Sequence, residues 1–241
     1  MSVEVVRNDD ADALATTVAE ALIERLTRIQ ADGRRPALVL TGGGIAAEVH
    51  RRVARSVTSL DVDWGDVEFW FGDERYVDAW SEDRNARQAR DSLLDHVAVD
   101  RSLVHEMPSA DSGLPVDDAA ADYALALPEA PYDVLMLGVG PDGHCASLFP
   151  GLPQVHATGR VTGVTDSPKP PPVRLSLTME ELNRAREVWF VVAGEEKAAA
   201  VGRALSGDTT LDETPCSGPR GTDRTVWFLD EAAATRVQRT A

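Results

Sequence analysis

The sequence predicts an α/β fold in which a mostly parallel β-sheet carries helices on both faces, and we expect residues 1–241 to form a single domain. Three observations support this prediction. Short apolar runs alternate with amphipathic segments along the chain, which is typical of parallel sheets covered on both faces. The length of 241 residues suits one such domain and is short for two. A hydrophobic content of 43% is enough for a sizeable core.

The N-terminal half alternates strand and helix. Leu14, Val18 and Leu22 recur at steps of three and four residues, which predicts an amphipathic helix that ends near Gly33. The run "ALVL" is fully apolar and therefore reads as a buried strand. The predicted elements are, in order, strand 3–7, helix 11–29, strand 37–40, helix 45–56 and strand 67–71.

The C-terminal half continues the alternation, so we expect a Rossmann-like arrangement. The segments "YDVLMLG" and "EVWFVVAG" are the clearest apolar strands in it. The predicted strands are 102–107, 132–138, 173–178, 187–194 and 225–230, and the predicted helices are 85–97, 117–127 and 195–205. The chain is expected to close on a short helix.

Polar loops directly follow three of the predicted strands. They are "TGGG" (41–44), "GDER" (72–75) and "GVGPDGH" (138–144). In parallel α/β sheets, ligands bind beyond the carboxyl ends of the strands. We therefore expect these loops to meet at one edge of the sheet and to form a site there.

The first of these loops is a candidate anion site. Gly42 and Gly43 carry no side chains, so the backbone can approach a ligand closely and aim N–H groups at it. The loop matches neither the phosphate-binding pattern that ends in Gly-Lys-Ser/Thr nor the G-x-G-x-x-G dinucleotide pattern. A tight turn between strand and helix, without a ligand, explains the glycines equally well.

The second loop supplies a candidate phosphate ligand, Arg75. A guanidinium can donate two parallel hydrogen bonds to a phosphate group. Asp73 or Glu74 would hold Arg75 in place. The alternative is a solvated cluster of charges at the end of a strand.

The third loop supplies a candidate general base, His144. Imidazole is the side chain best suited to proton transfer near neutral pH. Core histidines lie more often on regular elements than in a Gly-Pro loop such as "GPDGHCASLFPG". Asp142 would orient the imidazole or shape the loop, and these two possibilities stay open. For Cys145 we expect a packing role rather than nucleophilic attack.

Two further cations lie on the proline-rich segment "SPKPPPVRLSLT". In a chain of net charge −16, Lys169 and Arg174 on a stiff loop suit a phosphate ligand. An ordinary surface loop beside an edge strand is the alternative. Lys197, which follows strand 187–194, is expected at the surface.

The composition argues against several other classes of protein. With 24 basic and 40 acidic residues, the surface should repel nucleic acid and anionic membranes. No apolar run approaches the ~20 residues that span a bilayer. The five histidines and two cysteines show no metal-ligand spacing, so no metal is expected. The distant cysteines and the polar N-terminus, which is unlike a signal peptide, predict a cytoplasmic location.

Together these segments resemble the 6-phosphogluconolactonase family over nearly the whole chain. The most specific block is "LGVGPDGHCASLFPG" (137–151). The other blocks, in the family's order, are 41–44, 72–75, 83–94 with Asn85, 167–178 and "VVAGEEKA". Two positions depart from the family. The first loop reads "TGGGIA" where members commonly have Ser-Gly-Gly-Ser-Thr-Pro, and Cys145 stands where threonine is usual.

The resemblance implies a fold of the sugar-phosphate isomerase/deaminase type. It also implies hydrolysis of 6-phospho-D-glucono-1,5-lactone to 6-phospho-D-gluconate, a step of the oxidative pentose phosphate pathway. The partner would be this small phosphorylated sugar lactone, and no metal or organic cofactor is required because C1 is already electrophilic. His144 would take a proton from water, while Arg75, Lys169 and Arg174 would grip the phosphate. The oligomeric state is left open.

Two other functions stay open at this point. Glucosamine-6-phosphate deaminases share the fold, but their histidine loop continues Ile-Ala-Phe-Asn-Glu, whereas this chain continues "CASLFPG" without an acid. They also carry Asp-Glu-Tyr where this chain has Asp73, Glu74 and Arg75. A non-catalytic sugar-phosphate sensor would need an attached DNA-binding module, and we expect none because the chain starts with its first strand and is strongly acidic.

Overall fold

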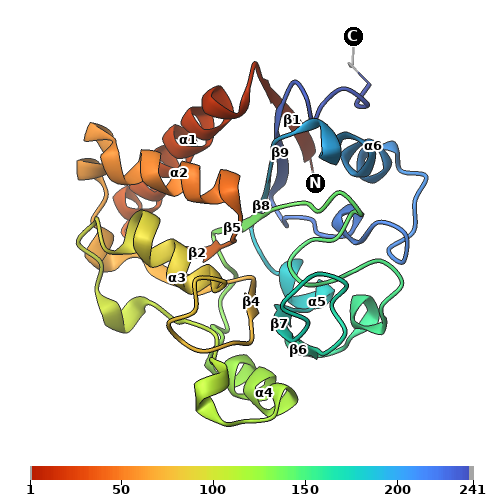
Figure 1. Cartoon of the computed structure of the whole chain (residues 1–241). Coiled ribbons are helices and arrows are strands. Elements are labelled where there is room, and N and C mark those ends of the chain that lie inside the picture. Colours follow the sequence, from red (N-terminus) through yellow and green to blue (C-terminus); the bar gives the residue numbers. More distant parts are fainter. Residues whose placement is uncertain (1, 239–241) are drawn as a thin grey trace.

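The computed structural model describes residues 2–238 and has a six-stranded sheet through its middle (Figure 1). The strands of this sheet are β1 (Ser2–Asn8), β2 (Ala37–Leu40), β3 (Glu68–Phe71), β5 (Val134–Leu137), β8 (Glu187–Val192) and β9 (Arg224–Asp230). Their order is β1-β9-β8-β5-β2-β3, and all neighbouring strands run parallel. The predicted α/β class with a mostly parallel sheet is therefore confirmed.

Helices lie on both faces of the sheet. Helices α1 (Ala11–Ala31) and α2 (Gly44–Arg55) cover one face, and α6 (Ala198–Ser206) lies on the other (Figure 1). The other helical segments are α3 (Asn85–Ala89), a π-turn (Arg90–Leu94), α4 (Val116–Ala126), α5 (Met179–Leu182) and 3₁₀ turns at Val57–Asp61, Trp64–Asp66, Arg101–Leu103, Ala110–Ser112, Pro153–His156, Glu195–Lys197 and Pro215–Ser217. Within residues 2–238, no helix is both long and apolar enough to cross a membrane.

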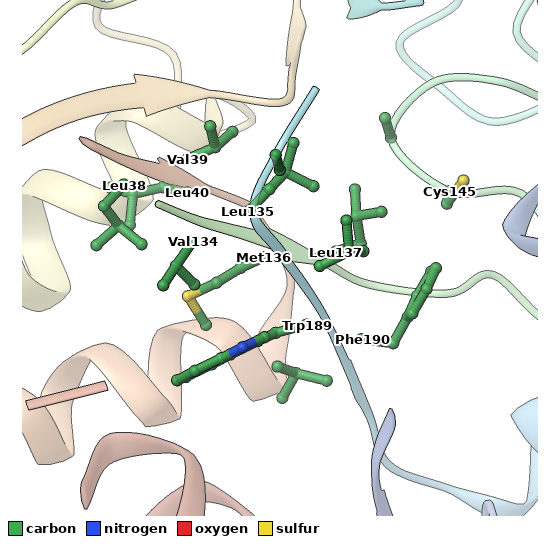
Figure 2. Packing of buried hydrophobic residues seen from close by; sticks show 14 of the residues in the cluster. Leu38, Val39, Leu40, Val134, Leu135, Met136, Leu137, Cys145, Trp189 and Phe190 are labelled. Atoms are coloured by element: carbon green, nitrogen blue, oxygen red, sulfur yellow. The ribbon is translucent and has the colours of Figure 1, made fainter. Parts of the chain in front are cut away.

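The core is built on the central strands. All residues of β2 and β5 are buried, because helices cover both faces, and this is why the two strands read as continuous apolar runs. In β5, Val134 and Met136 point to one side of the sheet and Leu135 and Leu137 point to the other (Figure 2). Packing on both sides fixes the direction of β5, whose carboxyl end leads directly into the loop that carries His144.

A second sheet, which is antiparallel, was not predicted. Its strands, in spatial order, are β4 (Asp73–Arg75), β7 (Arg174–Leu177) and β6 (Val161–Val164). The predicted strand 173–178 is real but belongs to this sheet, and most of the segment 72–75, expected as a loop, pairs with it as β4. The register puts Arg75 directly opposite Arg174. The second sheet thus brings together two cations that are distant in the sequence.

Two predicted elements, one strand and one helix, did not form as the sequence predicts. The strand expected at 102–107 is reduced to a single bridge between Val104 and Phe69. Pro108 follows closely and has no N–H group to continue a ladder. The closing helix is also missing, because residues 231–238 form turns and irregular structure.

The helix expected over 85–97 changes its winding after Ala89, where the π-turn begins. The Ser92 hydroxyl donates a hydrogen bond to the Gln88 carbonyl at 2.6 Å, which competes with regular backbone bonding. The same hydroxyl lies 3.2 Å from Nδ1 of His50, a fully buried side chain of α2. Nε2 of His50 has no hydrogen-bond partner within the described part of the chain.

His50 should make the protein less stable in mild acid. Burial, helped by the charge of Arg51, lowers the pKa of His50 from 6.5 to about 4, so the folded state resists a proton that the unfolded chain accepts. The unfolding free energy should therefore fall as the pH drops from 6.5 toward 4, by about 2 kcal/mol from this group at pH 5 relative to pH 8. Urea unfolding of wild type and His50→Leu across this range measures it. An equal pH dependence in both proteins would contradict the assignment.

Candidate active site

The carboxyl ends of β2, β5 and β8 and the strand β4 border a cavity of about 840 Å³. The three polar loops converge there, as predicted. The predicted site residues that line the cavity are Gly42, Gly43, Asp73, Arg75, His144, Lys169 and Arg174. Asp142 is the remaining one, and it reaches the cavity through its contact with His144. The structure therefore brings all eight together, while their roles stay predictions.

His144 and Asp142 form a close pair at the end of the β5 loop. Nδ1 of His144 lies 2.6 Å from Oδ1 of Asp142, which also accepts the His144 backbone N–H at 3.3 Å. A carboxylate only accepts hydrogen bonds, so Nδ1 carries the hydrogen and the Nε2 lone pair stays free. Partial burial pushes the pKa of Asp142 upward. The hydrogen bond and charge of His144 and the charge of Lys169 outweigh burial and hold that pKa well below its usual range.

Glycines allow this loop to fold so tightly. The Gly140 N–H donates to the His144 carbonyl at 2.9 Å, and the Gly143 N–H donates to the Gly140 carbonyl at 2.9 Å. A Cβ atom on Gly140 would lie 2.0 Å from Nδ1 of His144. Gly143 has φ +99°, a conformation that favours glycine. The centroid of the imidazole lies 4.5 Å from that of the Phe149 ring, which supports its other side.

Arg75 and Arg174 lie side by side on β4 and β7. The Arg75 guanidinium donates to the side-chain oxygen of Asn85. Arg174 is buried and donates to the carbonyls of Pro171 and Lys169, each at 3.1 Å. Burial, and then the charge of Arg75, lowers the pKa of Arg174. Neither arginine forms a salt bridge within residues 2–238, so the pair is suited to receive an anion.

The two acids beside Arg75 do not contact its guanidinium. Asp73 accepts hydrogen bonds from the Asn85 amide at 3.0 Å and from the Ser147 hydroxyl at 2.7 Å. Glu74 is fully buried and accepts the backbone N–H groups of Arg75 and Asn85 at 2.8 and 2.7 Å. The acids therefore hold backbone and neighbouring side chains in place, and Asp73 links the arginine strand to the histidine loop through Ser147.

The glycine loop packs against the arginine strand. A Cβ atom on Gly42 would lie 1.8 Å from Oδ1 of Asn85 and 3.0 Å from Nη1 of Arg75. Gly43 has φ +108°, and its N–H donates to the Gln88 side chain at 2.7 Å. Gly42 and Gly43 thus shape the wall of the cavity next to Arg75.

Gly42→Ala should damage the site and the fold together. Overpacking of this kind costs about 1–3 kcal/mol of unfolding free energy, and displacement of Asn85 and Arg75 should raise KM for the substrate. Thermal unfolding and steady-state kinetics measure the two effects. Gly44→Ala is the matched control for stability, because a Cβ there meets nothing within 4 Å. Equal stability of the two variants would show that the contact with Asn85 is unimportant.

Sequence reasoning missed Lys197, which it placed at the surface. The side chain lines the cavity and is only 22% exposed. Burial lowers the pKa of Lys197, and the positive charge of Lys169 acts in the same direction. The signal that marks Lys197 is its position just past the carboxyl end of β8.

Cys145, by contrast, is fully buried, and burial raises the pKa of its thiol, so the predicted packing role is confirmed (Figure 2).

Lys169 has an unexpected neighbour. Its Nζ lies 3.2 Å from Nδ1 of His144 and 3.5 Å from Oδ1 of Asp142. The sequence predicts a phosphate ligand at this position, whereas the side chain contacts the His144–Asp142 pair. The described residues include no group of three or more His, Cys, Asp or Glu side chains that could hold a metal ion.

Comparison with known proteins adds independent findings. The family model described as glucosamine-6-phosphate isomerases/6-phosphogluconolactonase matches residues 9–227. A Streptomyces coelicolor protein named 6-phosphogluconolactonase is 43% identical, over 98% of this chain and 95% of that protein. The crystal structure of a 6-phosphogluconolactonase from Thermotoga maritima has a TM-score of 0.84 at 27% identity, over 95% of this chain and 100% of that one. A monomeric glucosamine-6-phosphate deaminase has a TM-score of 0.78 at 20% identity, over 97% and 99% of the two chains, and this likeness concerns the fold alone.

Proposed function

This chain belongs to the family of glucosamine-6-phosphate isomerases and 6-phosphogluconolactonases, as its motifs predict, and we propose that it hydrolyses 6-phospho-D-glucono-1,5-lactone to 6-phospho-D-gluconate. The observation that carries the proposal is one cavity that is lined both by the His144–Asp142 pair and by the neighbouring guanidinium groups of Arg75 and Arg174. This hydrolysis is a step of the oxidative pentose phosphate pathway. Residues 1–241 would act as one domain, and the enzyme would work in the cytoplasm.

The phosphate is held on the side of the cavity formed by β4 and β7. Arg75 and Arg174 present two guanidinium groups to the dianion, and Lys197 is a further cation that lines the same cavity. Gly43, the N-cap of α2, has no side chain to cap the helix, and Gly43, Gly44 and Ile45 line the cavity, so the N-terminus of α2 is available to an anion there. A dianion relieves the repulsion between these cations. The net charge of −16 is thereby compatible with an anionic substrate.

His144 acts at the lactone carbonyl. With Nδ1 bonded to Asp142, its free Nε2 takes a proton from a water molecule as the water oxygen forms a bond to C1. The carbonyl oxygen becomes an oxyanion, which N–H groups of the glycine loops are positioned to stabilise. The C1–O bond to the ring oxygen then breaks, and the ring oxygen receives the proton from Nε2. The histidine ends neutral, and no other group is consumed.

Binding of the distant phosphate is what places C1 beside the histidine. The cations and the imidazole line the same cavity, so contacts remote from the reaction hold the carbonyl within reach of the base. The loop after His144 supplies no acid between Cys145 and Gly151, which separates this site from one that opens an amino-sugar ring.

The test is a turnover assay with lactone made in situ from glucose 6-phosphate by its dehydrogenase. Formation of 6-phosphogluconate should be faster with the protein than in a trace without it, since the lactone also opens spontaneously. Glucosamine 6-phosphate serves as the control substrate and should release no ammonia. A folded protein that leaves the spontaneous rate unchanged would overturn the proposal, and ammonia release would assign the deaminase reaction instead.

A further inference from the structure

The contact between Lys169 and the His144–Asp142 pair is built into the loop. The Ser167 hydroxyl accepts the Lys169 N–H at 3.2 Å and donates to the Lys169 carbonyl at 2.9 Å. Arg174 donates to the same carbonyl at 3.1 Å. The backbone of Lys169 is therefore fixed, and its ammonium group lies next to the imidazole, with Nζ 3.2 Å from Nδ1.

Two donors converge on one oxygen. The His144 Nδ1–H and the Lys169 ammonium both approach Oδ1 of Asp142, at 2.6 and 3.5 Å. Alone, the carboxylate would favour the imidazolium, because an opposite charge stabilises the protonated form. The ammonium offsets that charge at the same oxygen. A neutral imidazole is the form that can remove a proton from water.

We propose that Lys169 is a positioning residue for the base: it balances the charge of Asp142, so that Asp142 orients the imidazole of His144 without keeping it protonated. This inference rests on the proposed function, since it gives Lys169 a part in the same reaction. It differs from the phosphate-binding role that the sequence predicts for Lys169.

Both halves of the reaction gain from this arrangement. Before attack, the neutral imidazole accepts the proton of water at Nε2. After attack, the imidazolium lies next to an ammonium group, and this repulsion favours release of the proton to the ring oxygen. Asp142 without Lys169 would keep the imidazole protonated before attack and would hold the proton after attack, although it would still orient the ring.

Other charged groups also face this pair. Arg203 of α6 donates to the Asp142 carbonyl at 3.3 Å, and Lys197 and Glu196 line the same cavity. Arg174 lies over the Phe149 ring, 5.6 Å from its centroid, and that ring in turn packs against the imidazole. Within residues 2–238, the Lys169 ammonium is the cation that lies against the His144 ring, 3.2 Å from Nδ1. These other groups are unchanged when Lys169 alone is replaced.

The test is a titration of the His144 imidazole by NMR, which does not depend on turnover. The signal is assigned by its loss in His144→Gln. In Lys169→Met, the midpoint of protonation should move to higher pH by about one unit, a tenfold change in the equilibrium. Lys169→Arg keeps the charge and should stay close to wild type. Arg101→Met, which removes an exposed cation that pairs with Asp95 away from the cavity, is the matched control and should also leave the midpoint in place.

Kinetics then separate the two roles of Lys169. For a positioning residue, the acid limb of the kcat/KM profile should move with the NMR midpoint in Lys169→Met, and KM near neutral pH should change little. An unchanged midpoint together with a raised KM would overturn the inference and return Lys169 to the phosphate. If wild type fails to open the lactone, the proposed function fails, but a shifted midpoint would still establish the charge balance at His144.

Discussion

His144→Gln is expected to lower kcat by about a hundredfold or more, with little change in KM. Glutamine is similar in length and polar, but it cannot accept and return a proton. The contacts that would hold the phosphate lie on β4 and β7 and do not involve the imidazole. The loss should therefore appear in the chemical step rather than in binding.

The measurement is steady-state kinetics on the phosphorylated lactone, with the spontaneous rate subtracted. His156→Gln is the matched control, because His156 pairs with Asp212 and has a 58% exposed side chain. That variant should keep wild-type kinetics. Full activity in folded His144→Gln would remove His144 from the role of base while leaving the reaction itself assigned.

Arg75→Met is expected to have the second largest effect, lowering kcat/KM by about a hundredfold, mainly through a raised KM. Methionine keeps much of the apolar stem but removes the guanidinium that faces Arg174 and binds Asn85. The substrate phosphate then loses a charged, bidentate partner. Part of the loss should also reach kcat, because a loosely held phosphate places C1 less well.

Arg75→Lys separates charge from geometry. It should fall between wild type and Arg75→Met, since an ammonium group keeps the charge without the planar fork. Arg101→Met is the matched control, because Arg101 is exposed and pairs with Asp95 away from the cavity. An unchanged KM in Arg75→Met would disprove the phosphate assignment.

The large sheet was predictable because its central strands are buried on both faces. Burial of β2 and β5 makes long apolar runs that stand out in the sequence. The second sheet gives no such signal. Its strand β4 consists of Asp73, Glu74 and Arg75, which is not a strand-like composition, and in its strand β6 Gly163 interrupts a short run of β-branched residues. Only long-range pairing with β7 makes these segments strands.

The site was predictable at the level of loops and less so at the level of contacts. Strand ends and glycines indicated where His144 and Arg75 would meet. The sequence left two roles for Asp142 open, and the geometry contains both, because Oδ1 bonds the imidazole and the backbone N–H of His144. The cavity position of Lys197 and the contact of Lys169 depend on three-dimensional placement, which neighbouring residues in sequence do not reveal.

The central claim is that remote phosphate binding and the histidine base act on one substrate in one cavity. The most direct test compares kcat/KM for 6-phosphogluconolactone and for unphosphorylated glucono-1,5-lactone, in wild type, Arg75→Met and His144→Gln. Wild type should prefer the phosphorylated lactone by about a hundredfold or more, Arg75→Met should lose most of that preference, and His144→Gln should slow both substrates. Equal turnover of the two lactones by wild type, or a preference that survives in Arg75→Met, would contradict the account.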